Sequence, residues 1–185
     1  MNTKRVQNWD DSVAIGERAV REVTEFLLSD FVKNNWYPTQ LVHNVENEKI
    51  YRSFDIDLLW VVPVESFLRC YTVEVKGDQL HQFGNFFFET VSIKHRNTPG
   101  AFVISQAEWL FYYFVHIREL YCLPMGVTKT WFLENETRFK EATAHSQRNS
   151  RSWSTVGRKV PIQNVIDEVK GVRKFKYEVG LWRAA

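Results

Sequence analysis

Apolar residues recur with the period of an α-helix over the first strongly patterned segment, residues 12–32. At 100° per residue, Arg18, Glu22 and Glu25 fall on a polar face. The opposite face is mostly apolar and consists of Val13, Val20, Thr24, Leu27, Leu28 and Phe31. Ser12, which follows two aspartates, is the predicted N-cap. The pattern predicts an amphipathic helix over residues 12–32.

Glu17 stands out in this helical projection. It lies between Val13 and Val20, inside the apolar stripe rather than on the polar face. Burying an unpaired carboxylate is costly, so a buried Glu17 requires a partner, a proton or a metal ion. The alternative is a residue at the edge of the stripe that reaches water or meets an arginine.

The segments that follow are rich in β-branched and aromatic residues and predict a sheet. The predicted strands cover residues 40–45, 53–62, 70–76, 101–104, 128–133 and 172–182, and the Phe-rich part of 81–92 is a candidate for another. Predicted helices cover residues 105–121, where Ser105 and Glu108 have capping-box spacing, and 161–169, which opens on Pro161. Residues 141–159 are polar and basic and predict a loop.

This alternation predicts one mixed α/β domain over residues 1–185, with a central mixed sheet flanked by helices. Its core is expected over about residues 12–133, followed by a basic C-terminal extension over about residues 134–185. Residues 1–120 hold 12 Lys and Arg against 16 Asp and Glu, whereas residues 121–185 hold 12 against 6. An acidic N-terminal part and a basic C-terminal part suit a protein that binds cations in one place and phosphates in another.

No apolar run is long enough to span a bilayer, and the first residues lack the hydrophobic stretch of a signal peptide. Cys70 and Cys122 form neither a metal-binding pair nor a disulfide framework, and buried free thiols are expected. Together these features predict a protein of the reducing cytoplasm with no membrane partner. The five histidines show no zinc-ligand spacing.

The candidate chemistry lies in two adjacent predicted strands, within SFDIDLLWVVP and YTVEVKGD. Alternate side chains of a strand share a face, so Asp55 projects with Asp57, and Glu74 with Lys76. Adjacent strands can bring these carboxylates and the ammonium group to one spot. Hard oxygen ligands suit Mg²⁺ or Mn²⁺, which can activate a water for attack on a phosphodiester. Lys76 would orient or deprotonate that water and offset the charge that grows on the phosphate.

A Glu-x-Lys triplet carries little information alone, and the chain contains its own control. Glu-Val-Lys-Gly occurs at residues 74–77 and again at residues 168–171. The second copy ends a polar, helix-like segment with no aspartate-bearing strand before it, so a solvated helix end is predicted there. The upstream strand with Asp55 and Asp57 makes the first copy the candidate site.

The order of these motifs resembles the PD-(D/E)XK nuclease superfamily, in particular its phage and archaeal Holliday-junction-resolvase-like members. The resemblance rests on Gly16-Glu17 in a helix, Asp57 before a hydrophobic run, and Glu74-Val75-Lys76 in the next strand. It implies a restriction-endonuclease-like core, a catalytic set of Asp57, Glu74, Lys76 and Glu17, and metal ligation by Asp57, Glu74 and Glu17. No proline precedes Asp57, which departs from the pattern of the family name.

The resemblance covers roughly residues 14–120 and extends to a Gly84-Asn85-x-x-x-Glu89 segment found in some phage members. Asp55 and Glu89 are accordingly candidate additional site residues; for Glu89 the alternative is a strand glutamate that faces solvent. The implied reaction is Mg²⁺- or Mn²⁺-dependent hydrolysis of DNA, branched or duplex. By analogy with resolvases a homodimer is expected, with the aromatic segment 105–121 as its interface.

The polar segment 141–159 is the candidate DNA-binding surface. Its candidate contacts are Arg148, Arg151, Trp153, Arg158 and Lys159. Arg and Lys can neutralise phosphates, and an indole can stack on an exposed base. The alternative is a solvated loop without a ligand. For the whole chain, the alternatives to a DNA nuclease are a structure-specific or RNA-cleaving nuclease, a non-catalytic nucleic-acid-binding module on the same fold, and a coincidental motif in an unrelated protein.

Overall fold

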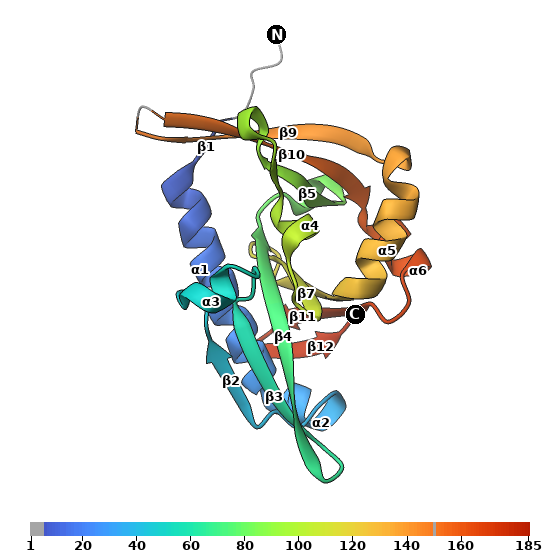
Figure 1. Cartoon of the computed structure of the whole chain (residues 1–185). Coiled ribbons are helices and arrows are strands. Elements are labelled where there is room, and N and C mark those ends of the chain that lie inside the picture. The colour runs from blue at the N-terminus through green and yellow to red at the C-terminus, as the bar shows by residue number, and fades with distance from the viewer. Residues whose placement is uncertain (1–5, 150) are drawn as a thin grey trace.

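The computed structural model describes residues 6–149 and 151–185, which form two mixed β-sheets with helices around them (Figure 1). The larger sheet has the strand order β12 (Leu181–Ala184), β11 (Arg173–Glu178), β8 (Glu119–Pro124), β7 (Trp109–Phe114), β4 (Phe67–Asp78), β3 (Leu58–Val64) and β2 (Leu41–Asn44). The smaller sheet has the order β1 (Val6–Asn8), β9 (Lys140–Arg148), β10 (Arg151–Pro161), β5 (Asn85–Ile93) and β6 (Thr98–Pro99). The parallel pairs are β4–β7 and β1–β9. The predicted mixed α/β class is confirmed.

The helices cover both sides of the larger sheet. They are α1 (Trp9–Leu28), α2 (Asp30–Asn35), α3 (Lys49–Arg52), α4 (Ala101–Ile104), α5 (Met125–Asn135) and α6 (Ile162–Glu168), with short 3-10 turns at His81–Phe83, Lys94–Arg96 and Glu136–Arg138. One face of the larger sheet packs on α1 and α2, and the other faces the smaller sheet, α5 and α6. In the described part of the chain, no helix has the length and apolar character that crossing a membrane requires.

Helix α1 begins at Trp9, three residues before its predicted cap, and Ser29 follows its last residue. Asn8, not Ser12, is the N-cap, and its side chain accepts a hydrogen bond from the Asp10 N–H at 3.1 Å. Ser29 ends α1 and caps α2, so the single helix predicted over residues 12–32 is two helices. At Gly77, an added Cβ would lie 2.9 Å from Ala19 Cβ and 2.9 Å from the Ile15 carbonyl oxygen. Glycine at this position of β4 therefore lets the helix lie directly on the sheet.

The buried face of α1 is rotated from the predicted one. Val13 and Leu28 are exposed, and so is Glu17, which agrees with the alternative of a residue that reaches water and not with burial in the apolar stripe. Glu22, predicted on the polar face, is only 8% exposed. The helix turns Ala19, Val23 and Phe26 to the sheet, and a buried carboxylate is tolerated among them because it has partners.

Glu22 is satisfied by three side chains. Its oxygens accept hydrogen bonds from Arg18 Nε at 2.8 Å and from the Tyr113 hydroxyl at 2.5 Å, and Arg118 Nε lies 3.7 Å away. Burial raises the pKa of Glu22, but the hydrogen bonds from Tyr113 and Arg18 and the two positive charges outweigh it and hold this pKa below the ordinary value of 4.5. The network fastens α1 to β7.

Glu22→Gln is expected to lower the free energy of unfolding by about 2 kcal/mol at pH 7, because it removes charged hydrogen bonds from a buried site. Since the folded-state pKa of Glu22 is depressed, this contribution is present above the unfolded pKa near 4.5 and is lost as the pH falls through the folded value. Urea denaturation at pH 7 and pH 3 measures both effects. Glu25→Gln, on the exposed side of the same helix, is the control, and an equal loss in both variants would contradict the prediction.

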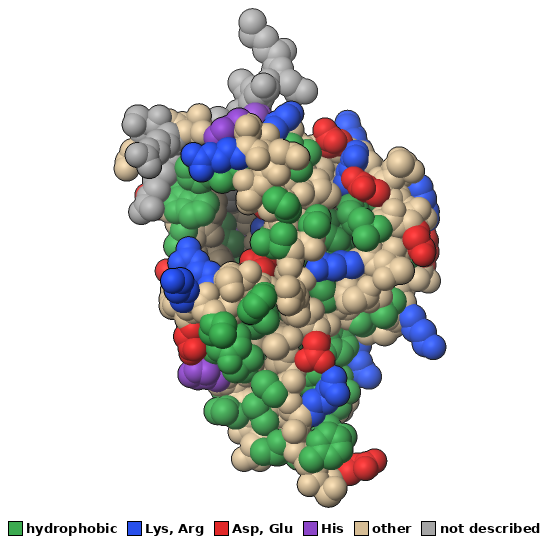
Figure 2. All heavy atoms as spheres, viewed as in Figure 1, with side chains coloured by type: hydrophobic (Ala, Val, Ile, Leu, Met, Phe, Trp, Pro, Cys, Tyr) green, Lys and Arg blue, Asp and Glu red, His purple; other side chains and the backbone are tan. Residues whose placement is uncertain are grey.

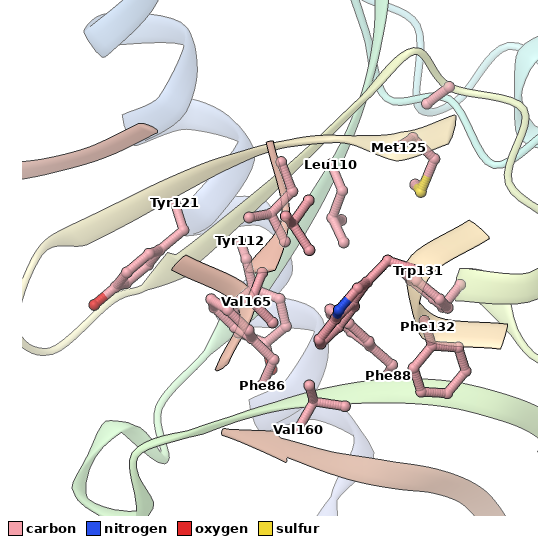
Figure 3. Packing of buried hydrophobic residues seen from close by; sticks show 14 of the residues in the cluster. Phe86, Phe88, Leu110, Tyr112, Tyr121, Met125, Trp131, Phe132, Val160 and Val165 are labelled. Atoms are coloured by element: carbon pink, nitrogen blue, oxygen red, sulfur yellow. The ribbon is translucent and has the colours of Figure 1, made fainter. Parts of the chain in front are cut away.

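The space between the two sheets is filled by a second aromatic core. Figure 3 shows Phe86 and Phe88 of β5 beneath Tyr112 and Leu110 of β7, with α5 contributing Trp131 and Phe132. Each of Phe86, Phe88 and Tyr112 is almost completely buried. The Phe87 N–H also donates to the Tyr112 hydroxyl at 3.1 Å, which joins β5 to the larger sheet.

Residues 101–133 reverse three sequence predictions. The helix predicted over residues 105–121 is the β7–β8 hairpin, the strand predicted over 101–104 is α4, and the strand predicted over 128–133 lies in α5. Ser105 does not cap a helix; its hydroxyl donates to the Asp55 carbonyl at 3.1 Å, and Glu108 instead accepts from Arg69 Nη2 at 2.7 Å. Both strands of this hairpin are buried inside the sheet, so residues 105–121 do not supply the exposed helical surface on which the homodimer expectation relied.

Several other local predictions are corrected. Residues 141–159 are not a loop but most of the β9–β10 hairpin, and residues 49–52 form α3, so the strand predicted from residue 53 begins at Leu58. Strands β9 and β10 belong to the smaller sheet, and β11 and β12 belong to the larger one. The basic C-terminal part of the chain is therefore an integral part of the fold. Cys122 is buried as predicted, whereas Cys70 is exposed. The helix predicted over residues 161–169 is confirmed as α6.

Candidate active site

Asp57 is fixed to β4 on both sides of Glu74. It immediately precedes β3, where its backbone N–H donates to the Val73 carbonyl at 2.9 Å. The Val75 N–H in turn donates to Asp57 Oδ2 at 2.8 Å. These two hydrogen bonds hold the Asp57 carboxylate against the Glu74 side chain, and the two carboxyl groups come within hydrogen-bonding reach. The structure thus brings together two of the predicted catalytic residues.

Lys76 follows two residues after Glu74 in β4 and shares its face of the strand. Its charge acts on both Glu74 and Asp55, so the predicted ammonium group belongs to the same cluster. Asp55 was predicted to lie on the same strand as Asp57. It instead occupies a turn, with a left-handed φ of 57°. The Ser105 hydroxyl and the Gln106 N–H bond to carbonyl groups of this turn and hold it in place.

The carboxylates of the cluster are in an environment that disfavours their charge. Burial, and then repulsion from Asp55, raise the pKa of Asp57 to about 6 in spite of the hydrogen bond from Val75. The pKa of Glu74 is raised well above its ordinary value by burial and by the charges of Asp57 and Asp55. Burial also raises the pKa of Asp55. A nearby cation would therefore stabilise the charged form of each carboxylate.

Among the described residues, two carboxylate oxygens of the cluster lack the hydrogen bonds that buried polar atoms usually make. Asp55 Oδ2 and Glu74 Oε2 are buried and have no hydrogen-bond partner in the described part of the chain. Within residues 6–149 and 151–185, no group of three or more His, Cys, Asp or Glu side chains is arranged as a complete metal site. Mg²⁺ needs no such group, since it commonly binds through one or two carboxylates with water and substrate phosphate as its other ligands. The Asp57–Glu74 pair fits that requirement.

Two further side chains add charge near the cluster. Glu89 of β5 adds negative charge near Asp55, and its Oε1 accepts a long hydrogen bond of 3.4 Å from the Ala101 N–H. Glu89 is half-buried, so it is not the fully solvated strand residue of the alternative. Lys129 of α5 adds positive charge near Asp55, and its Nζ donates to the Ser105 and Val103 carbonyls. The sequence did not single out Lys129, because a strand was predicted there.

Glu17 does not join this cluster. Ile15 and Ala19 form the side of α1 that meets Gly77, and a residue two positions from each points away from that contact. Glu17 is exposed, in agreement with this geometry. The expectation that Glu17 is a catalytic and metal-binding residue therefore has no support in its position.

Lys76 and Glu89 connect the cluster to a cleft of about 950 Å³, whereas the side chains of Asp55, Asp57 and Glu74 lie behind its described lining. Lys76, Asp78 and Glu89 line it on the side of the two sheets, and Trp9, Ser12 and Ile15 of α1 form another wall. The hollow is visible in Figure 2, between α1 and the β9–β10 hairpin of Figure 1. Asp78, predicted to make a turn, accepts from the Leu80 N–H at 2.7 Å and from the Tyr112 hydroxyl at 2.5 Å.

The predicted DNA-binding residues divide into three groups. Trp153 and Lys159 line the cleft, although they do so from a strand rather than from a loop. Arg158 is turned to carboxylates instead, with Nε 3.1 Å from Glu136 Oε1 and Nη2 3.6 Å from Glu141 Oε2. The side chains of Arg148 and Arg151 lie outside the described residues.

The cleft also contains residues that the sequence did not indicate. Trp9 of α1 packs edge-on against Trp153 with ring centroids 5.0 Å apart, and Lys159 Nζ lies 5.8 Å from the centre of the Phe83 ring. Lys94 lines the same space. Trp9 lies three residues before the predicted helix, and Phe83 lies in the 3-10 turn that precedes β5, so no periodic pattern marked either of them.

The second Glu-Val-Lys-Gly copy serves a structural purpose. Glu168 ends α6 and accepts two hydrogen bonds from Arg138 and one from Trp131 Nε1, while Lys170 is exposed. The prediction of a helix end is confirmed.

No family model, curated protein or solved structure matches this chain.

Proposed function

We propose that this protein is a divalent-metal-dependent nuclease that hydrolyses phosphodiester bonds in DNA. The observation that carries the proposal is the anchoring of Asp57 on both sides of Glu74, with Lys76 on the same face of β4. One oxygen of this pair, Glu74 Oε2, and one oxygen of the neighbouring Asp55, Oδ2, are buried without a hydrogen-bond partner in the described chain, which is costly for the fold alone. A cation held at Glu74, next to Asp55, accounts for their retention.

The residues of the cluster have distinct tasks in this reaction. Asp57 and Glu74 would hold Mg²⁺ or Mn²⁺, which supplies Lewis-acid chemistry to a phosphodiester when bound. Lys76, next to them, orients the attacking water and offsets the negative charge that grows on the phosphate oxygens. The adjoining cleft excludes bulk water from part of the substrate and holds it by contacts away from the scissile bond.

The fold proposed for this activity is a restriction-endonuclease-like core. Its support is that the three elements bearing the resemblance lie together: α1 packs on β4 through Gly77, and β3 pairs with β4 beside Asp57 and Glu74. The helix glutamate is the departure, since Glu17 points away from the cluster. The proposal therefore uses Asp57, Glu74 and Lys76, with Asp55 and Glu89 as neighbours that shape their charge.

Purified full-length protein is expected to cut DNA in Mg²⁺ or Mn²⁺ and to stop cutting when EDTA is added. The assay compares plasmid, linear duplex, branched junctions and single strands, with RNA of matched sequence as a further substrate. DNA binding without cleavage in either metal would replace the nuclease with a non-catalytic binding module. Cleavage of RNA alone would assign the other polymer, and neither binding nor cleavage would make the motif a coincidence.

A further inference from the structure

The cleft beside the cluster is bordered by a ring of connected elements. Strand β1 pairs with β9, β9 pairs with β10, and β10 pairs with β5. On the other side α1, which follows β1 directly in the chain, packs on β4 through Gly77. The edge-on contact of Trp9 with Trp153 adds a link between α1 and the β9–β10 hairpin. In Figure 1 these elements surround the space into which the hollow of Figure 2 opens.

The lining of this space combines aromatic rings with positive charge. Trp9, Trp153 and Phe83 offer ring surface, and Phe83 is 59% exposed. Three ammonium groups accompany them, from Lys76, Lys94 and Lys159. Of the two acidic residues that line the cleft, Asp78 is already engaged by Tyr112. The chemistry that matches rings beside ammonium groups is an unpaired base joined to a phosphate.

Size and shape favour one strand over two. A volume of about 950 Å³ is near the upper end for pockets that hold single small ligands, at roughly 1,000 Å³. It holds a short stretch of one flexible strand, whereas a duplex needs an open surface and hides the faces of its bases by stacking. The ring of connected elements adds a second constraint, because a strand that passes through it has to enter by an end.

We propose that the substrate is single-stranded DNA, and that a free end of the strand threads between α1 and the β9–β10 hairpin to reach Lys76. This inference rests on the proposed function, since Lys76, which lines the cleft, shares its face of β4 with Glu74. Bases stack on Trp153 and Phe83, and phosphates pass Lys159 and Lys94.

The first experiment measures binding without cleavage, by fluorescence anisotropy in EDTA. A linear 20-nucleotide DNA strand is compared with its covalently closed circle, with a blunt duplex and with RNA of the same sequence. We expect the linear DNA strand to bind at least about ten-fold more tightly than the circle or the duplex, with affinity that falls steeply as salt increases. Equal binding of the circle would overturn threading, and tighter binding of duplex or RNA would overturn the substrate.

The second experiment tests the lining with matched variants. Trp153→Ala and Lys159→Ala are each expected to weaken binding of the linear strand about ten-fold, which corresponds to about 1.4 kcal/mol. Phe67→Ala and Lys170→Ala remove the same kinds of side chain from exposed positions outside the cleft and should leave binding unchanged. Trp153→Phe keeps a ring at the contact with Trp9 and should retain most of the affinity. Equal losses in the lining and control variants would overturn the assignment.

The two proposals fail in different ways. Metal-dependent cutting of duplex and circular DNA at the rate of linear single strands would remove the threading inference and leave the nuclease in place. Tight binding of the linear strand without cleavage in Mg²⁺ or Mn²⁺ would remove the nuclease and leave the cleft as a site for single-stranded DNA.

Discussion

Lys76→Ala is expected to lower the rate of DNA cleavage by a factor of about 10² to 10⁴, with little change in thermal stability. The side chain is the ammonium group that shares the face of Glu74, and its charge acts on both Glu74 and Asp55. Removing it takes away the group that orients water and balances charge on the phosphate, while the carboxylates remain. Single-turnover cleavage in Mg²⁺ measures the loss.

The chain provides a matched control for this variant. Lys170→Ala makes the same change in the second Glu-Val-Lys-Gly copy, where the lysine is exposed at the end of α6 and the glutamate binds Arg138. It should cut like the unaltered protein. Lys76→Arg keeps the charge but changes its shape and should fall between the two. A Lys76→Ala protein that is folded and fully active would move the catalytic role to another residue.

The candidate site was predictable because its information is local. Asp57 precedes a hydrophobic run, and Glu74 and Lys76 alternate with apolar residues in the next predicted strand, so two short patterns and one connection place them on neighbouring strands. The hydrogen bonds from Asp57 to Val73 and from Val75 to Asp57 follow from that pairing. Asp55 was placed less well, because a left-handed turn ends the alternation that the sequence suggested.

The buried face of α1 could not be predicted from a local pattern in the same way. The helical projection placed Glu17 in the apolar stripe and Glu22 on the polar face, whereas the residues that decide which of them is buried lie elsewhere in the chain. Tyr113 and Arg118, about ninety residues later, satisfy Glu22 and stabilise it in its buried position. The wide apolar stripe of this helix allows either rotation until those partners are known.

Residues 109–124 show a different limit. A strand that is buried on both faces has no alternation of apolar and polar residues, so the run Trp109–Phe114 has no period to separate it from a buried helix. The β9–β10 hairpin is the opposite case, since most of its residues are polar and its order comes from pairing with β5 and β1. Because that pairing is distant in sequence, the wall that closes the cleft was predicted as a loop.

Asp57→Asn is expected to raise the free energy of unfolding by about 2 kcal/mol at pH 7 in EDTA, an increase of about 5 °C in Tm. In the folded protein the pKa of Asp57 is about 6, against an ordinary value of 3.8, so its ionisation opposes folding. The amide that replaces the carboxylate would still accept the Val75 N–H through its oxygen and could donate to Glu74 through its nitrogen. A neutral side chain therefore keeps the contacts and removes the repulsion.

The pH dependence gives the sign of this effect a separate check. Because the folded-state pKa is raised, the unaltered protein loses stability relative to Asp57→Asn as the pH rises from about 4 through about 6. The difference between the two proteins should be largest at pH 7 and should vanish below pH 4. Thermal denaturation in EDTA across this range measures it. Glu65→Gln neutralises an exposed carboxylate in the β3–β4 turn and is expected to change stability by no more than about 0.5 kcal/mol.

Adding Mg²⁺ should reverse the order of the two proteins. A cation that binds only the folded state stabilises it by about 2.7 kcal/mol at a concentration one hundred times its Kd, and this gain belongs to the protein that keeps Asp57. Asp57→Asn should respond weakly to the metal and should cut DNA poorly, whereas Glu65→Gln should behave like the unaltered protein in both respects. If Asp57→Asn instead lowers Tm in EDTA, the carboxylate is favourably paired within the fold itself, and its burial ceases to be an argument for a metal site. A stability gain that disappears on metal binding would mean that the cluster is held in an unfavourable state for the sake of the ion it binds.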